Sequence, residues 1–257
     1  MAQPVFSLKG VSFAYEPGID ALAGFDLAIA QGERVALIGA NGTGKSTLLS
    51  ILDALAFPDS GTYEAFGEAI TERAMRDSGR QRSFRKRVGF VFQNPDAQLF
   101  CPSVREDIAF GPLQLGAGRD ETLERVERVA ARLRVGHLLD RAPHQLSIGE
   151  KRKVAIAGVL AIGCDAILLD EPTAGLDPRT SGEIAGILAE ENAAGRTVCL
   201  ATHDLHLVAE LACVVHAFGP RGRVERSGTA RDLLSDRPFL EAMNLMHPAS
   251  RLSFIED

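Results

Sequence analysis

The segment Gly39–Ser46, which has the sequence GANGTGKS, constrains the fold of this chain more than any other feature. It follows an apolar run at 35–38 that predicts a buried strand, and it opens a predicted helix that begins near Gly44 and ends before Pro58. Glycines let the backbone curl so that successive N–H groups point inward, and a helix N-terminus favours an anion. A strand, a glycine-rich loop and a helix in this order predict a phosphate-binding loop rather than a chance turn.

The side chains of this loop indicate ATP with Mg²⁺ as the bound group. Lys45 is expected to place its charge beside the β- and γ-phosphates, and the Ser46 hydroxyl is expected to bind Mg²⁺. The six histidines are scattered, and we interpret His203 and His206 as separate residues rather than a transition-metal pair. The expected nucleotide contacts of the loop are Gly39, Asn41, Gly42, Thr43, Gly44, Lys45, Ser46 and Thr47.

A second apolar run, at 166–169, ends in the adjacent carboxylates Asp170 and Glu171. At the end of a strand near a phosphate site, Asp170 is expected to hold Mg²⁺, and Glu171 to act as the general base for the attacking water. By itself such a run indicates only the exit of a strand. Together with the glycine-rich loop it predicts a P-loop NTPase.

Predicted strands and helices alternate along most of the chain, which indicates an α/β fold with a mostly parallel sheet covered on both faces. The basic run at 80–87 is interpreted as a solvated loop. The apolar tail after Gly228 is expected to form one or two short helices. The expected strands are 5–15, 27–29, 35–38, 88–92, 166–169 and 197–201, with a hairpin at 61–70. The other expected helices are 119–134, 149–162 and 178–194.

Composition limits the kinds of partner. The 257 residues carry a formal net charge of -6, which argues against broad nucleic-acid binding. The four cysteines form no CxxC pair, so free thiols in a reducing cytosol are expected. No signal peptide is expected at the start of the chain. The longest apolar stretch, Val154–Ile162, is about half of the roughly 20 residues that span a bilayer, so any work at a membrane requires partners.

The segment Leu146-Ser147-Ile148-Gly149-Glu150 lies at the start of the predicted helix 149–162. Here the chain resembles the ABC ATPase family, whose signature motif reads Leu-Ser-Gly-Gly-Gln. The resemblance implies a dimer in which Ser147 and Gly149 contact the ATP held on the P-loop of the opposite subunit. Without the other motifs, Ser147 would be expected to be a plain helix N-cap.

The chain departs from the family motif at two positions. Ile148 replaces a glycine, and a β-branched side chain does not easily adopt positive φ, so we expect Ile148 to point away from the nucleotide. Glu150 replaces glutamine, which is a mild change that also suits the first turn of a helix.

Four further positions match the family, and the resemblance implies a role for each. Gln93 would contact Mg²⁺ and water and link to a membrane partner, and Asp177 would lie in the loop that crosses the dimer interface. His203 would sense the γ-phosphate, and Tyr15 would stack on adenine. Each residue has a structural alternative. Gln93 would be a polar residue at a strand end, and Asp177 would lie in a turn before a helix. His203 would be an exposed histidine, and Tyr15 a packed tyrosine.

The resemblance extends from about Val5 to Gly228 and implies an ATPase domain at 1–228. That domain would contain an antiparallel β subdomain and a helical signature subdomain at about 94–163, and a helical tail at 229–257 would follow it. The tail is expected either to contact a second subunit or to pack on its own domain.

A narrower likeness, to the ATPases of energy-coupling-factor transporters that import cobalt or nickel, lies in Phe92–Phe100, Val104–Pro112 and Lys153–Leu160. It implies a dimer, with a homodimer expected, at the cytoplasmic face of the cell membrane. The partners would be a transmembrane scaffold subunit and a substrate-binding membrane subunit. Vitamin import is the alternative within this group, because importers of vitamins share much of these segments.

Two alternatives lie outside transport. A non-transport ABC ATPase of DNA repair or translation usually has two ATPase domains or a long coiled coil, whereas this chain has a single P-loop and no heptads. A small-molecule kinase would share the P-loop, but the segment Leu146–Glu150 and His203 argue against it.

Overall fold

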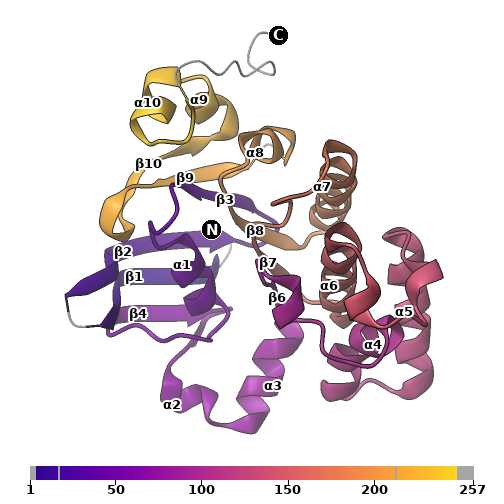
Figure 1. Cartoon of the computed structure of the whole chain (residues 1–257). Helices are drawn as coiled ribbons and strands as arrows, with labels where there is room; N and C mark the ends of the chain where they lie inside the picture. The colour runs from indigo at the N-terminus through magenta and orange to yellow at the C-terminus, as the bar shows by residue number, and fades with distance from the viewer. Residues whose placement is uncertain (1–3, 17, 212, 248–257) are drawn as a thin grey trace.

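The computed structural model describes residues 4–16, 18–211 and 213–247, which form two sheets flanked by helices (Figure 1). A four-stranded antiparallel sheet has the order β2-β1-β4-β5, and a six-stranded sheet has the order β10-β9-β3-β8-β7-β6. The strands are β1 Pro4–Glu16, β2 Ile19–Ala30, β3 Arg34–Gly39, β4 Ser60–Ala65, β5 Glu68–Ala69, β6 Val88–Val91, β7 Ala166–Asp170, β8 Thr197–Thr202, β9 Val214–Phe218 and β10 Val224–Thr229.

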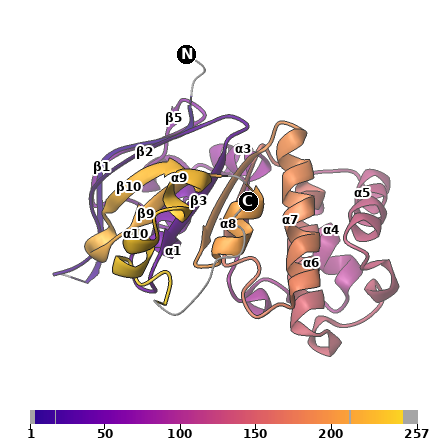
Figure 2. The same ribbon diagram turned by 90° about the horizontal axis from the view of Figure 1, so that it is seen from above.

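Helices lie on both sides of the six-stranded sheet. The helices α4, α5, α6 and α7 lie on one side, while α1 and the antiparallel sheet lie on the other (Figure 2). The α-helices are α1 Lys45–Leu52, α2 Glu72–Met75, α3 Ser78–Arg87, α4 Val104–Gln114, α5 Arg119–Arg132, α6 Ile148–Ile162, α7 Pro178–Ala193, α8 Leu205–Leu211, α9 Ala230–Leu234 and α10 Arg237–Ala242. The 3-10 turns are η1 Pro95–Ala97, η2 Gly136–Leu138, η3 Pro143–Gln145 and η4 Pro220–Gly222.

The six-stranded sheet brings the motifs together because five of its strands are parallel. Strands β6, β7, β8, β3 and β9 pair in parallel, and only β10 is antiparallel. Their carboxyl ends therefore meet at one edge, which is where open α/β sheets bind ligands. The P-loop follows β3, Glu171 follows β7 and His203 follows β8 at this edge.

The core is divided between the two faces of this sheet. One apolar cluster joins the sheet to α4–α7 and to the tail, and the other joins it to α1 and the antiparallel sheet. Alternate residues of β3 belong to different clusters, since Ala36 and Ile38 face one side and Val35 and Leu37 the other. This burial on both faces explains the continuous apolar runs of the parallel strands.

The predicted fold class is confirmed, including the antiparallel β subdomain and the helices around the signature motif. Two predictions of local structure were wrong. The strand predicted at 27–29 is part of the longer β2, because pairing with β1 extends it to Ile19. The basic run at 80–87 is not a loop but belongs to α3, where Asp77 caps the helix through Arg80 N–H and Phe84 is buried.

The C-terminal tail packs against its own domain. It forms two short helices, α9 and α10, as the sequence predicts. Leu233, Leu234 and Leu240 are buried in the same apolar cluster as the six-stranded sheet. These residues therefore agree with the alternative that the tail packs on its own domain. Residues 248–257 of the predicted tail lie outside the described part of the chain.

Within residues 4–16, 18–211 and 213–247, none of the helices combines the length and the apolar character that crossing a bilayer demands. The four cysteines are free thiols, as predicted, and three of them are buried.

Candidate active site

The P-loop takes its shape from glycines at positions where a side chain has no room. At Gly39, φ is 157° and an added Cβ would lie 2.6 Å from the Phe218 carbonyl oxygen. At Gly44, which precedes α1, φ is 93° and a Cβ would lie 2.4 Å from the Ala21 carbonyl oxygen. Only glycine fits such positions without strain, so the loop stays open above the first turn of α1.

Lys45 lies inside the curl of the P-loop. Its Nζ donates hydrogen bonds to the carbonyl oxygens of Gly39, at 2.8 Å, and Ala40, at 2.9 Å. Burial lowers the pKa of Lys45, and the nearby carboxylates Glu171 and Asp170 oppose that shift. The ammonium group is thus held inside the loop, where it can donate a charge-assisted hydrogen bond to a phosphate oxygen.

Asp170 and Ser46 form the part of the site that suits a divalent cation. Burial raises the pKa of Asp170, and the nearby Ser46 hydroxyl opposes that shift. The Oδ1 atom of Asp170 is buried and has no hydrogen-bond partner among the described residues. An unsatisfied carboxylate oxygen beside a hydroxyl is the donor set that Mg²⁺ prefers, so these residues fit the ion.

Glu171 has a backbone conformation that is rare for its residue type. Its φ is 46°, in the left-handed region, and its N–H donates to the Ala201 carbonyl oxygen at 2.8 Å. Non-glycine residues seldom occupy this region, and such strain clusters at functional sites. In this conformation the carboxylate bonds to residues at the end of the neighbouring strand β8.

Two residues at the end of β8 hold the Glu171 carboxylate: Thr202, the last residue of the strand, and His203, which follows it. His203 Nδ1 lies 2.8 Å from Glu171 Oε1, and the Thr202 hydroxyl donates to Oε2 at 3.2 Å. An ionised carboxylate only accepts hydrogen bonds, so this contact places the proton of His203 on Nδ1. The Glu171 side chain is 7% exposed and the His203 side chain 60%, so the carboxylate is fixed while the imidazole reaches solvent.

Glu171 and His203 line a cavity of about 470 Å³ together with residues of the tail. The tail contributes Leu245, Met246 and His247 to its wall. His206 also lies there, on the exposed side of α8 as the sequence predicts, and the described residues contain no group of histidine, cysteine and acidic side chains arranged for a metal ion.

Gln93 and Tyr15 lie at the margins of the site. Gln93 is exposed and follows the end of β6 by two residues. Tyr15 is 66% exposed, its hydroxyl lies 3.1 Å from the Thr47 hydroxyl, and its ring meets Phe13 edge to face with centroids 5.1 Å apart. An exposed ring fixed beside α1 is placed to stack on a base.

The signature residues form a second group that is separate from the P-loop. The Ser147 hydroxyl accepts from Glu150 N–H at 3.3 Å, and the Glu150 carboxylate accepts from Ser147 N–H and Oγ–H, both at 2.8 Å. These bonds make a capping box at the start of α6, and they lower the pKa of Glu150. Ile148 is 57% exposed.

Gly149 and Asp177 lie close together in this second group. A Cβ on Gly149 would contact Leu176 and Thr180 at 3.7 Å, while Asp177 caps α7 by accepting from Thr180 N–H at 3.0 Å. Among the described residues no hydrogen bond joins Ser147 or Asp177 to the P-loop. The chain therefore presents its P-loop and its signature loop as two separate groups.

The sequence did not predict two residues of the site, Thr202 and Arg152. Thr202 bonds to Glu171, although a threonine at a strand end gave no signal of its own. Arg152 is 2% exposed, lies near Asp170 and Glu171, and donates to the Phe92 carbonyl oxygen at 3.0 Å. Arg152 carries no clear signal in the sequence, because it lies between Lys151 and Lys153 and only the structure shows that it is buried. Arginine is almost never fully buried unless it is paired.

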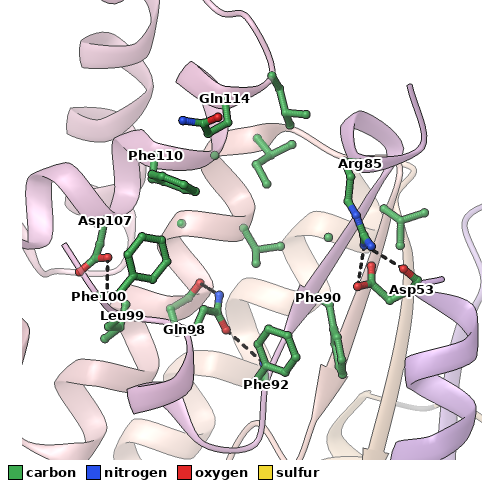
Figure 3. Close-up of a pocket in the computed structure, with 18 of the residues that line it drawn as sticks. Asp53, Arg85, Phe90, Phe92, Gln98, Leu99, Phe100, Asp107, Phe110 and Gln114 are labelled. Atoms are coloured by element: carbon green, nitrogen blue, oxygen red, sulfur yellow. Dashed lines mark hydrogen bonds and ion pairs between the residues drawn. The ribbon is translucent and has the colours of Figure 1, made fainter. Parts of the chain in front are cut away.

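A groove of about 440 Å³ lies between β6, η1, α3, α4 and α6 (Figure 3). Phe100 and Phe110 form an edge-to-face pair on one wall, with centroids 4.9 Å apart, and are 65% and 41% exposed. On the opposite wall Arg85 pairs with Asp53 at 2.7 Å, and burial raises the pKa of Asp53 to about 6. The groove is apolar at its centre and charged at one rim.

Comparison with known families settles the class of protein. The model of the ABC transporter family matches residues 22–174, which contain the P-loop, the signature motif and the Asp170–Glu171 strand. The chain belongs to the ABC transporter family. It is an ATP-binding ATPase coupled to transmembrane transport.

Curated relatives from bacteria and archaea are similar over most of their length. The nickel import ATP-binding protein NikO of Rhodobacter capsulatus is 48% identical over 95% of this chain and 96% of its own. The cobalt import ATP-binding protein CbiO of the same organism is 42% identical over 95% and 86%. The energy-coupling factor transporter ATP-binding protein EcfA of Methanothermobacter thermautotrophicus is 40% identical over 95% and 77%.

Solved structures agree with the fold. CbiO1 from Clostridium perfringens, part of the ABC transporter complex CbiONQ, superposes with a TM-score of 0.80 and 34% identity, over 96% of both chains. The ATP-binding cassette MJ0796, solved as a dimer in a post-hydrolysis state with ADP and Pi, gives a TM-score of 0.79 and 28% identity, over 88% of this chain and 98% of its own.

Proposed function

We propose that this chain is the ATPase of an energy-coupling-factor importer that powers the uptake of nickel or cobalt. The similarity to the nickel import protein NikO, 48% identical across almost all of both chains, carries the proposal. The arrangement of Lys45, Asp170, Glu171 and His203 at one sheet edge supports it, because these are the groups that ATP hydrolysis requires.

The nucleotide binds at the P-loop in this proposal. Backbone N–H groups of the loop and the N-terminus of α1 bind the phosphates, and Lys45 exchanges its two carbonyl partners for the β- and γ-phosphates. Tyr15 stacks on the base. The further contacts are the loop residues Gly39, Asn41, Gly42, Thr43, Gly44, Ser46 and Thr47.

Ser46, Asp170 and Gln93 would hold Mg²⁺. The unsatisfied Oδ1 of Asp170 supports this assignment. The ion supplies charge neutralisation to the phosphates when it is bound. Gln93 is exposed in the segment after β6, so it would contribute to the ion where that segment brings its side chain to Asp170.

Glu171 is the general base for the attacking water. Two hydrogen bonds orient its carboxylate, and the strained backbone aims it out of the strand. His203 positions the base and its exposed ring reaches toward the γ-phosphate. The water loses its proton to Glu171 as its oxygen attacks phosphorus, and the bond to the β,γ-bridging oxygen breaks.

Each site is completed by a second subunit. Ser147 and Gly149 present a hydroxyl and backbone N–H groups at the start of α6, and Asp177 lies beside them on the same surface. Among the residues that the structure describes, none of them bonds to the P-loop of the same chain. Two chains arranged about a twofold axis would place the signature group of each subunit over the P-loop of the other. Two bound ATP molecules would then hold the dimer closed until hydrolysis.

The groove with Phe100 and Phe110 receives a helix of a transmembrane scaffold subunit. Its exposed aromatic pair and apolar centre fit an amphipathic helix, and its volume of about 440 Å³ suits a few side chains. A substrate-binding membrane subunit then completes the complex. The ATPase is attached peripherally at the cytoplasmic face of the membrane.

The test is to purify the tagged protein from detergent-extracted membranes of its native cell and to identify the subunits that accompany it. A scaffold subunit and a metal-binding membrane subunit, with uptake of labelled nickel or cobalt that stops in a Glu171→Gln strain, are expected. A vitamin-binding subunit would change the substrate and keep the mechanism. Ribosomes or nucleic acid in place of membrane subunits would contradict the transport proposal.

A further inference from the structure

A group of exposed positive charges lies on the helices α2 and α3. Residues 72–87 contain seven basic side chains and two acidic ones, so this segment has a formal charge of +5 in a chain whose net charge is -6. Three of the basic side chains form ion pairs, which are Arg76–Glu72, Arg85–Asp53 and Arg87–Asp165. The other four are exposed and form no ion pair with the described residues; these four, which we call the basic patch, are Arg73, Arg80, Arg82 and Lys86.

The basic patch is not explained by the stability of α3. Arg80 lies in the first turn of the helix, where the helix dipole disfavours a positive charge. Lys86 gains from the dipole in the last turn, but it lies four residues after Arg82, and like charges at this spacing repel. The buried side chain of α3 is Phe84, so the helix has little apolar packing to offset this repulsion. Negative charge outside the molecule would relieve it.

Acidic side chains near the patch do not neutralise it. Asp77 caps α3 by accepting a hydrogen bond from Arg80 N–H at 2.8 Å, and the other acidic residue of the segment is in an ion pair. Glu68 of β5 lines the same shallow hollow as Arg80, and no ion pair joins the two within the described part of the chain. No acidic residue lies within α3 itself. Arg82 and Lys86 therefore carry the charge that is least compensated.

The place of the patch in the molecule indicates what kind of anion it meets. The helix α3 also carries Arg85, which lines the groove with Phe100 and Phe110 where we place a helix of the transmembrane scaffold subunit. The helices α2 and α3 lie at the end of the molecule away from α9 and α10 (Figure 1). A surface beside a groove that holds a membrane-anchored helix faces lipid headgroups, and clusters of basic residues in such positions bind anionic lipids.

We propose that the basic patch binds anionic phospholipid headgroups of the cytoplasmic leaflet, beside the helix that fills the groove. The proposal rests on the proposed function only for the orientation of the groove toward the membrane. Each basic side chain near an anionic bilayer raises the partition coefficient by about fivefold. The attraction fades within about 10 Å at 0.1 M salt, so only a surface that lies close to the headgroups can use it.

The test uses the isolated full chain and vesicles, without any partner subunit. Vesicles of phosphatidylcholine alone are compared with vesicles of equal parts phosphatidylcholine and phosphatidylglycerol, and flotation measures the bound fraction. We expect the wild type to bind the anionic vesicles only, and to lose this binding near 1 M salt, where screening acts within about 3 Å. Replacing all four patch residues by glutamine should lower the partition coefficient by about a hundredfold or more.

A matched control removes four exposed positive charges from other surfaces: Lys9→Gln, Arg128→Gln, Arg223→Gln and Arg231→Gln. This variant has the same net charge as the patch variant, so a difference between the two depends on where the charges lie. It should bind anionic vesicles nearly as well as the wild type.

Two smaller variants keep the test valid if the fourfold patch variant fails to fold. Arg82→Gln with Lys86→Gln should lower the partition coefficient by about twentyfold. Changing Arg73, Arg80 and Arg82 to lysine keeps every charge and should preserve binding, because a headgroup at a diffuse surface requires charge rather than a fixed guanidinium geometry.

The proposal is overturned if the wild type binds both kinds of vesicle alike or neither, or if the patch variant and the matched control lose binding equally. If the wild type ignores the vesicles and the patch variant no longer co-purifies with the scaffold subunit, the patch binds an acidic segment of that subunit, which also overturns the lipid assignment. None of these results decides the proposed function, which depends on metal uptake and on the subunits that accompany the wild-type chain.

Discussion

The P-loop group and the signature group differ in how completely one chain builds them. Lys45 is buried and bonded within the P-loop, and Asp170 and Glu171 are buried at the end of the strand β7. Ser147 is exposed, and its side-chain hydrogen bonds within the described part of the chain are to Glu150 of its own helix. One half of the site is preorganised by the core, and the other is presented on the surface, where a second subunit can use it.

The largest expected effect is a loss of turnover caused by a substitution in the preorganised half of the site. Glu171→Gln removes the general base, so turnover should fall by about 10² to 10⁴-fold. ATP should still bind at the P-loop, and the unreleased nucleotide should hold a dimer that light scattering detects. Hydrolysis at the wild-type rate would show that Glu171 is not the base. Glu16→Gln, on the exposed end of β1, serves as a control with the same chemical change.

Lys45→Ala removes the charge from the same half and should weaken ATP binding by at least about tenfold, since a hydrogen bond to a charged group is lost. Calorimetry of the single chain measures this without dimerisation. Lys9→Ala, an exposed residue of β1, is the control. Unchanged affinity would remove Lys45 from the phosphate site.

Ser147→Ala removes the hydroxyl of the signature group. ATP binding to the single chain should stay unchanged, while turnover should fall by about tenfold or more. Mixing Ser147→Ala with Lys45→Ala sharpens the comparison. In a homodimer with split sites, a mixed pair has one intact site, so activity should recover to about a quarter of the wild-type value after statistical exchange. No recovery would mean that each site is built within a single chain.

Glu150→Gln tests the departure from the family motif. The Ser147 hydroxyl donates to the Glu150 carboxylate, and a neutral amide removes both this strong acceptor and a negative charge near the partner nucleotide. ATP-dependent dimerisation in the Glu171→Gln background should therefore tighten by about threefold. Light scattering across a range of ATP concentrations measures this dimerisation. An unchanged or weaker dimer would show that the Glu150 carboxylate does not keep the Ser147 hydroxyl from the nucleotide.

A smaller effect than those at Glu171, Lys45 and Ser147 is expected at Tyr15. Tyr15→Ala should weaken ATP binding by about five- to tenfold through lost stacking, as base–aromatic contacts commonly do. Tyr15→Phe keeps the ring and loses only the contact with the Thr47 hydroxyl, so it should bind ATP nearly as well as the wild type. Equal losses in both variants would assign the effect to the hydroxyl instead of the ring.

The sequence predicted much of the candidate site because its parts are local. Glycine spacing defines the P-loop, and an apolar run followed by Asp170 and Glu171 defines the end of a strand. It failed at the basic run 80–87, where the high charge concealed the cap at Asp77 and the single buried side chain, Phe84, that fix α3 as a helix. Hydrophobic periodicity is a weak signal when one apolar residue provides the packing.

The chain by itself determined which residues carry the chemistry, since the glycines, the carboxylates and the signature serine are set by short-range patterns. Only the tertiary structure decided how they are held. Glu171 points out of its strand because Thr202 and His203, 31 and 32 residues away, bond to its carboxylate. Gln98 accepts a hydrogen bond from Phe92 N–H and donates one to the Ala155 carbonyl oxygen in α6, 57 residues away. Such long-range bonds leave no periodic trace in the sequence, because a single polar side chain can reach its partner from many positions in the fold.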